Sequence, residues 1–263
     1  MGAKIFKVDS FAAEPFTGNP AGVCISAGPR DEAWMQGIAR EMNLAETAFL
    51  HSSRDGFNLR WFTPAVEVKL CGHATLASAH ILWEAGILAA GKEARFATKS
   101  GLLTAVKRGE MIELDFPAKP EEPAVAPEGL IEALGVHPLY IGRNEFDYLV
   151  EVESEAIVRG MEVDFARLKR VEARGVIVTS LASTRGFDFV SRFFAPAVGV
   201  DEDPVTGSAH CCLGPYWGVK LARVEFTAYQ ASARGGVVHV RLAGDRVRLG
   251  GRAITILRGE LAV

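Results

Sequence analysis

Two loops of this sequence carry side chains that could hold an anion or transfer a proton. Each loop leads through a glycine into an apolar stretch that is predicted to form a helix. Backbone N–H groups at a helix start have no intrahelical partner and carry the positive end of the helix dipole. Such a start suits a bound carboxylate, although an ordinary helix start is the alternative for either loop taken alone. The candidates are Cys71, Gly72 and His73 in the first loop and Asp203, Thr206, Gly207 and Ser208 in the second.

The N-terminal half adds a carboxyl group and an amide to these candidates. Glu46 lies where a predicted helix that ends at Asn43 gives way to an apolar strand. It could be solvated at the end of that strand, or it could face a cleft in which desolvation raises its pKa. In the second case it would be a usable general acid or base. Asn19, in a loop rich in proline and glycine, is a candidate for substrate binding.

Several of the polar residues also have ordinary structural explanations. A single histidine at a helix start, such as His73, is often only a hydrogen-bonded structural residue. Asp203 could be one of three solvated acids at 201–203, but its place before the Gly207 loop favours it over its neighbours. His80 and His210 fall inside predicted helices, so we expect packing or surface roles for them.

Both loops belong to a segment that occurs twice, at 60–75 and at 192–210. The shared order is an arginine, an aromatic residue, Pro-Ala-Val, a valine and a Gly-X-Ala step, with three extra residues in the second copy. A repeated supersecondary unit has to be recognised before the rest of the fold is interpreted. We interpret the segments as two copies of one unit that face each other. The aligned residues are Arg60, Phe62, Pro64, Ala65, Val66, Val68, Gly72 and Ala74 with Arg192, Phe194, Pro196, Ala197, Val198, Val200, Gly207 and Ala209.

The predicted elements are mostly strands, with one long buried helix in each half. The helices are predicted over Ala74–Leu88 and Ser208–Lys220, and Gly214-Pro215 should kink or break the second. Residues 117–127 hold four prolines and form the best domain boundary. The sequence therefore predicts an α+β protein with domains 1–117 and 118–263, each a mixed sheet wrapped around a central helix.

Composition excludes several classes of partner. The chain has 263 residues, 49% of them hydrophobic and 23% charged, which is typical of a globular protein. A net charge of −3 gives no basic surface for nucleic acid, and no apolar run has the roughly 18 residues of a membrane span. The N-terminus lacks the apolar core of a signal peptide, so we expect a cytoplasmic protein.

The cysteine spacing argues against a metal centre. Cys24, Cys71, Cys211 and Cys212 form no Cys-x-x-Cys, and no two histidines have the spacing of metal ligands. In a reducing compartment such cysteines stay free thiols.

The longest motifs resemble the PhzF family, the phenazine-biosynthesis-like isomerases. They are VDSFAAEPFTGNPAGV, EMNLAETAFL, RWFTPAVEVKLCGHATLASA and DEDPVTGSA, and together they extend the resemblance over essentially the whole chain. The wider fold of that family is that of diaminopimelate epimerase and proline racemase. The resemblance implies two pseudo-symmetric domains with the active site between them, a homodimer, and catalysis without a cofactor or metal.

The resemblance also implies roles for individual residues. Glu46 would move the proton, His73 would contact substrate or relay a proton, and Asp203 would belong to the catalytic set. Ser208 and the backbone amides around Gly72 and Gly207 would hold the substrate carboxylate. The best-known reaction of the family is isomerisation of trans-2,3-dihydro-3-hydroxyanthranilate, although many relatives lie outside phenazine pathways.

Three functions follow from these residues. The first is a cofactor-independent isomerase that moves a proton on a small carboxylated substrate, cyclic or amino-acid-like, by single-carboxyl acid–base catalysis in the interdomain cleft. The second is an amino-acid racemase or epimerase that uses Cys71; epimerase relatives use two thiols, but Thr206 stands at the second place, and a hydroxyl is a poor base at neutral pH. The third is a non-catalytic module that binds small anions.

Overall fold

The computed structural model describes residues 2–263 and divides into two compact units. Unit 1 comprises Met1–Asp115 and Gly250–Val263, and unit 2 comprises Phe116–Leu249. The first boundary falls close to the predicted one after residue 117. The C-terminal boundary differs from the prediction, because strand β18 (Ala253–Glu260) pairs antiparallel with β1 (Lys4–Ser10). The end of the predicted domain 118–263 therefore belongs to unit 1.

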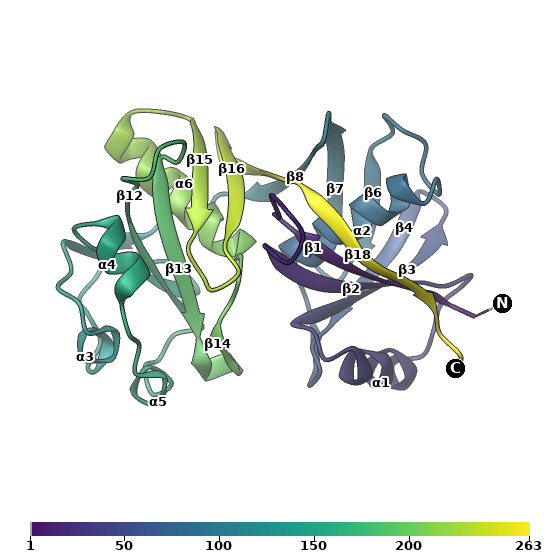
Figure 1. The fold of residues 1–263 in the computed structure, drawn as a ribbon, viewed down its shortest axis with the longest axis horizontal. Coiled ribbons are helices and arrows are strands. Elements are labelled where there is room, and N and C mark those ends of the chain that lie inside the picture. Colours follow the sequence, from purple (N-terminus) through teal and green to yellow (C-terminus); the bar gives the residue numbers. More distant parts are fainter. Residues whose placement is uncertain (1) are drawn as a thin grey trace. The chain divides into compact units, whose positions relative to one another are not determined.

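The sheet of unit 1 is mixed and contains both parallel and antiparallel neighbours (Figure 1). From β18 and β1 the order continues through β2, β3, β4, β6, β7 and β8. The β2–β3 and β4–β6 pairs are parallel and the other neighbours are antiparallel, while the short β5 pairs with β4. The bounds are β2 (Asn19–Ile25), β3 (Glu46–Ser53), β4 (Gly56–Phe62), β5 (Glu67–Val68), β6 (Ala94–Thr98), β7 (Gly101–Arg108) and β8 (Met111–Pro117).

Helix α2 (Gly72–Glu84) is the buried centre of unit 1. Every residue from His73 to Trp83 except His80 is buried, and the helix packs against β1, β2 and β3. A helix that is apolar or small on all sides has no face to offer to water, so it belongs in a core. This confirms the predicted central helix, although it ends earlier than the predicted Leu88.

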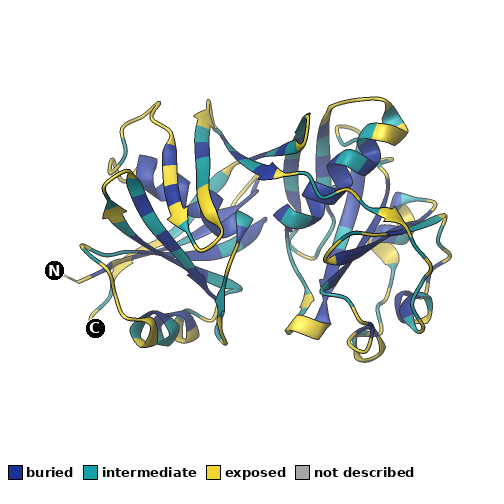
Figure 2. Ribbon diagram, turned by 180° about the vertical axis from the view of Figure 1, so that it is seen from behind, coloured by how far each residue is buried: buried dark blue, intermediate teal, exposed yellow. Residues whose placement is uncertain are grey.

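Helix α1 (Glu32–Met42) covers the side of the strands opposite α2 (Figure 1). Its Met35, Ile38 and Ala39 pack into a cluster with residues of the sheet, and its outer side is exposed (Figure 2). Both ends of the helix are capped: Asp31 accepts the Trp34 N–H at 2.8 Å, and Asn43, the predicted end of the helix, adopts the left-handed conformation. A left-handed residue reverses the chain directly after a helix.

Unit 2 repeats the strand order of unit 1. Its order β10, β11, β12, β13, β15, β16 runs antiparallel, parallel, antiparallel, parallel, antiparallel, as do β1, β2, β3, β4, β6 and β7. The repeat in the sequence is therefore a repeat of the fold, as predicted. The strands are β9 (Glu122–Pro123), β10 (Tyr140–Arg143), β11 (Asp147–Glu151), β12 (Gly175–Leu181), β13 (Phe189–Ala195), β14 (Val200–Glu202), β15 (Glu225–Gln230), β16 (Gly236–Ala243) and β17 (Arg246–Gly251).

Three short helices of unit 2 contribute to one apolar cluster with its strands. Their residues Leu130, Val158 and Leu168 pack with Val176 and Phe194. The helices are α3 (Leu130–Leu134), α4 (Glu155–Gly160) and α5 (Phe165–Leu168), and a 3₁₀ turn, η1 (Pro196–Val198), follows β13. None of the helices in residues 2–263 combines the length and the apolar composition that a membrane crossing requires.

The central helix of unit 2, α6 (Gly207–Leu221), continues through Pro215, so the predicted break does not occur. A proline inside a helix cannot donate to the carbonyl four residues earlier, which here is that of Cys211. The backbone N–H of Lys119 donates to this carbonyl at 3.0 Å. A donor from the segment between β8 and β9 thus replaces the missing helical one, and the helix can contain the proline without leaving a buried carbonyl unpaired.

The repeated arginine braces the loop that precedes each central helix. Arg60 makes a two-point ion pair with Glu67, at 2.7 Å for both contacts. Arg192 makes the equivalent pair with Glu202, at 2.7 and 2.9 Å. A guanidinium that binds a carboxylate through two parallel hydrogen bonds fixes orientation as well as position. In both copies the arginine therefore holds the loop against the strand that precedes it.

Candidate active site

Glu46 is placed by the turn between α1 and β3. It is the first residue of β3, and the parallel register sets it opposite Ala21 of β2. Its side chain is only 20% exposed, and it points to the start of α2. Of the two alternatives for Glu46, the solvated strand end is therefore wrong, and the carboxylate faces other polar groups.

His73 is the partner of that carboxylate. Its Nε2 lies 3.2 Å from Glu46 Oε2, and its side chain is 6% exposed. On the other side of the ring, Asn19 Nδ2 lies 3.2 Å from Nδ1. A neutral His73 accepts from Asn19 and donates from Nε2, whereas a protonated His73 requires the Asn19 amide to be turned so that its oxygen faces Nδ1. Both forms carry a proton on Nε2, so Glu46 accepts a hydrogen bond in either.

Cys71 completes this group, which we call the α2 triad (Glu46, Cys71 and His73). Cys71 is the N-cap residue of α2, and its side chain makes no capping hydrogen bond. Its Sγ lies 3.5 Å from His73 Nδ1 and 4.0 Å from Nε2. Burial, followed by the negative charge of Glu46, raises the pKa of the Cys71 thiol to about 11. The charge and hydrogen bond of His73 act in the opposite direction but are outweighed, so Cys71 is a thiol at neutral pH.

The other two members of the α2 triad stabilise each other as ions. Burial acts to raise the pKa of Glu46, but the charge and hydrogen bond of His73, with a hydrogen bond from Cys71, outweigh it and lower that pKa. Burial favours the neutral form of His73, but Cys71 and Glu46 outweigh it and raise the His73 pKa well above its usual range. In the alternative that places Glu46 in a cleft, desolvation was expected to raise its pKa; the neighbouring histidine reverses the sign.

The backbone under the α2 triad is held by the β1–β2 turn. Ser10 Oγ donates to the His73 carbonyl at 2.8 Å, and Ser10 lies opposite Asn19 in the antiparallel register. Gly18 makes the turn possible, because it adopts φ 70° and a Cβ there would lie 2.2 Å from the Ser10 carbonyl oxygen. Ser10 was not among the predicted residues, since nothing in a strand-end serine signals a contact 63 positions away.

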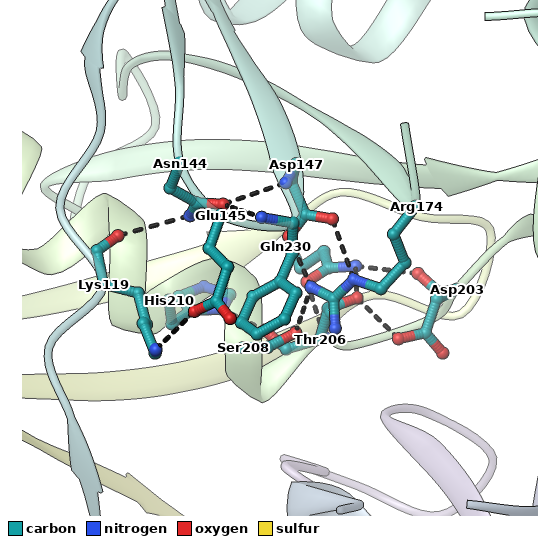
Figure 3. Close-up of polar contacts among 11 residues, drawn as sticks. Lys119, Asn144, Glu145, Asp147, Arg174, Asp203, Thr206, Ser208, His210 and Gln230 are labelled. Carbon is teal, nitrogen blue, oxygen red and sulfur yellow. Dashed lines mark hydrogen bonds and ion pairs between the residues drawn. The ribbon is translucent and has the colours of Figure 1, made fainter. Parts of the chain in front are cut away.

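The loop before α6 forms a second polar group, in unit 2 (Figure 3). Thr206 Oγ1 donates to Asp203 Oδ2 at 2.5 Å. The fully buried Gln230 accepts the Thr206 N–H at 2.8 Å and donates to the Asp203 carbonyl at 2.7 Å. The Gln230 amide therefore fixes both ends of the Asp203–Thr206 turn. The Thr206 hydroxyl is therefore engaged and is not poised to act as a base.

Ser208, in the first turn of α6, is held by an arginine that the sequence did not reveal (Figure 3). Arg174 Nη2 donates to Ser208 Oγ at 3.0 Å. The same guanidinium binds the buried carboxylate of Asp147 through Nε, at 2.9 Å, and through Nη2. Because Ser208 Oγ accepts from Arg174, its own proton is directed elsewhere and can be donated to a ligand.

The histidines inside the helices have the structural roles that were predicted. His210 is fully buried in α6, its Nδ1 lies 2.8 Å from the Thr206 carbonyl, and burial lowers its pKa to about 4. His80 pairs with Thr255 at 3.0 Å within unit 1. All four cysteines are buried and free, as expected.

The predicted residues thus fall into one group in each unit. In unit 1, Glu46, Cys71 and His73 meet with Asn19, and Gly72 is the first residue of α2. In unit 2, Asp203 meets Thr206, and Ser208 follows Gly207 at the start of α6. Neither helix has an acidic residue in its first turn or a side-chain cap at its start. Both starts therefore keep N–H groups that can bind an anion.

Residues 8–259 match the family of phenazine biosynthesis-like proteins, PhzC-PhzF. The chain belongs to this family. It is 57% identical to an uncharacterized isomerase of Halalkalibacterium halodurans over 99% of each chain. A PhzF-family protein of Enterococcus faecalis, 39% identical, has a crystal structure that superposes with a TM-score of 0.95 over the whole of both chains. The protein is accordingly an isomerase of the PhzF family.

A more distant likeness concerns the fold of the PhzF family alone. A probable proline racemase of Agrobacterium radiobacter, 14% identical, superposes with a TM-score of 0.66 over 99% of this chain and 93% of that one. This confirms the predicted epimerase-like fold.

Proposed function

We propose that this isomerase moves a proton on a small carboxylated substrate and that Glu46 is the single acid–base group. The observation that carries the proposal is the 3.2 Å contact between Glu46 Oε2 and His73 Nε2 at the uncapped start of α2. A carboxylate kept ionised beside an anion-binding helix start is ready to accept a proton from a carbon next to the bound carboxylate. The transfer uses only groups of this chain.

The lowered pKa of Glu46 suits a proton that is held only briefly. When Glu46 accepts a proton from substrate, its attraction to the protonated His73 is lost, so the protonated state is of high energy. Return of the proton to a second carbon restores the ion pair. In the resting state the Nε2–H of His73 donates a hydrogen bond to Glu46 and so orients the carboxylate that accepts the substrate proton. Removal and return from one side of the substrate shifts a double bond without inverting a centre.

Two-thiol inversion, as in a racemase, is the second enzymatic candidate, and the side chains argue against it. Cys71 has a pKa of about 11, raised first by burial, and its thiolate is scarce at neutral pH. The residue at the second position, Thr206, donates its hydroxyl to Asp203 at 2.5 Å. Neither group is an effective base in this state.

Cys71→Ser distinguishes the two enzymatic candidates. Small cyclic and amino carboxylates are incubated with the protein in deuterated water, and deuterium uptake at carbon is followed by mass spectrometry. We expect an accepted substrate to exchange, and Cys71→Ser to slow exchange by less than about tenfold, since acid–base catalysis by Glu46 alone provides the larger factor. A slowing beyond about a thousandfold would support thiol chemistry. Carboxylate binding with no exchange on any ligand would support the non-catalytic alternative.

Ser208→Ala should weaken the capture of a carboxylate. We expect KM to rise about tenfold with kcat changed less than about threefold, because a donated hydrogen bond to a charged group contributes about 1.5 kcal/mol to binding. Steady-state kinetics measure the split. Ser100→Ala, which removes an exposed hydroxyl that donates to Lys69, is the matched control and should leave both constants unchanged. A fall in kcat with constant KM would instead place Ser208 in the chemical step.

A further inference from the structure

The α2 triad presents one carboxylate, one thiol and one imidazole to a common point. The three ligand atoms all lie within 4.8 Å of one another, and in residues 2–263 this is the one group of three or more such side chains that approach so closely. Zinc bonds of about 2.0–2.3 Å at tetrahedral angles require ligand atoms about 3.3–3.7 Å apart. The Glu46–His73 contact of 3.2 Å and the Cys71–His73 contact of 4.0 Å to the same Nε2 lie close to that range.

The charges of the triad also match a divalent cation. With the metal bound, Glu46 and a Cys71 thiolate supply two negative charges, and a neutral His73 supplies none. The buried site then has no net charge, so burial of the ion carries no uncompensated electrostatic cost. Zinc binds well to thiolate and imidazole ligands, whereas magnesium and calcium prefer oxygen ligands. One tetrahedral position remains for water.

The surroundings hold the imidazole as they would hold a metal ligand. A histidine that binds zinc commonly has its second ring nitrogen hydrogen-bonded to a neighbour, which sets the tautomer and the ring orientation. Here Asn19 lies 3.2 Å from His73 Nδ1, and Ser10 fixes the His73 backbone through its carbonyl at 2.8 Å. The Asn19 amide can present its oxygen to Nδ1–H, which leaves Nε2 free for the metal.

We infer that the α2 triad is a binding site for a thiophilic divalent cation of the Zn²⁺ class, which acts as an inhibitor. On binding, Cys71 and His73 release the protons on Sγ and Nε2 to solvent, and three coordinate bonds form to Sγ, Nε2 and a Glu46 oxygen. The bound ion coordinates the Glu46 oxygen that would otherwise receive a substrate proton, and it thereby blocks proton transfer. The inference concerns the same side chains as the proposed function, but the binding itself does not depend on that function.

The test is a calorimetric titration of the metal-free protein with Zn²⁺, without substrate. We expect one equivalent to bind, and Cys71→Ser and Glu46→Gln each to weaken binding at least about tenfold, as loss of one of three ligands should. Cys24→Ser is the matched control, because Cys24 is buried in β2 and is not part of the triad. It should bind Zn²⁺ as the unaltered protein does.

Co²⁺ gives a second reading that reports the thiolate directly. A cobalt–thiolate bond absorbs in the near ultraviolet, and the band should appear with the unaltered protein and be lost in Cys71→Ser. Absence of stoichiometric Zn²⁺ binding, or binding unaffected by both triad variants, would overturn the inference. Neither result bears on deuterium exchange, so failure of the metal site and failure of the proposed catalysis can be told apart.

Discussion

Glu46→Gln should lower the rate of substrate deuterium exchange by at least about a thousandfold, which is the scale of a lost general base. Glutamine has nearly the same shape as glutamate, and its amide oxygen can still accept from His73 Nε2, which lies 3.2 Å from the carboxylate. It cannot accept and return a proton. The fold and the capture of a carboxylate ligand should therefore persist while exchange stops.

A matched substitution tests whether the loss of deuterium exchange is specific to position 46. Glu41 is exposed near the end of α1, and Glu41→Gln makes the same chemical change a few residues away. We expect it to exchange substrate at the original rate. Circular dichroism and a ligand titration of Glu46→Gln establish that the protein is folded and binds. If that variant were folded and kept near-normal exchange, Glu46 would have no part in the mechanism.

Glu155→Gln should have the largest effect on stability, about 3 kcal/mol at neutral pH. The side chain of Glu155, at the start of α4, is 3% exposed and accepts hydrogen bonds from Arg159 and from the backbone and hydroxyl groups of Ser183 and Thr184. Burial raises its pKa, but the bonds from Thr184, Arg159 and Ser183 outweigh burial and lower it to about 2. A folded-state pKa of about 2, against an ordinary value of about 4.3, corresponds to about 3 kcal/mol.

The sign of the Glu155 effect can be tested by pH. A carboxyl group with a depressed folded-state pKa stabilises the fold above its unfolded pKa and loses that contribution as pH falls toward the folded pKa. Urea unfolding should therefore show that the difference in the free energy of unfolding between the unaltered protein and Glu155→Gln shrinks progressively from about pH 5 to about pH 2. Glu153→Gln, at an exposed neighbouring position, should stay within about 0.5 kcal/mol of the unaltered protein. A gap that stayed constant with pH would mean that the charge of Glu155 is not what stabilises the loop.

The sequence predicts an element correctly where its end carries a residue type that is typical of a cap or turn. The end of α1 at Asn43 was predicted, and the structure has this residue in the left-handed conformation directly after the helix. The parallel pairing of β6 with β4 has no local signal, because β5 and α2 separate the two strands in the sequence. Periodicity reports which face of an element is buried but not which element it pairs with.

Some polar residues of the candidate site were predicted from the sequence, and others were found only in the structure. Glu46, His73 and Cys71 belong to recognisable motifs, and the structure brings them together, although their catalytic roles remain predictions. Arg174 and Asp147 meet because β11 and β12 pair in parallel with Asp147 opposite Gly175. No spacing rule connects Asp147, the first residue of β11, with Arg174, which lies 27 positions later and directly before β12. The sign of the Glu46 pKa shift likewise depended on a neighbour that only the fold supplies.

The pairing of β18 with β1 has a consequence for biosynthesis. Unit 2 is one uninterrupted stretch that ends at Leu249, whereas the sheet of unit 1 needs residues from 253 to 260 beside β1. During synthesis, unit 2 can therefore fold completely while unit 1 still lacks its edge strand β18. Until that strand arrives, β1 exposes unpaired backbone groups on its outer side, which makes the nascent chain most vulnerable to aggregation and chaperone capture at its N-terminal end.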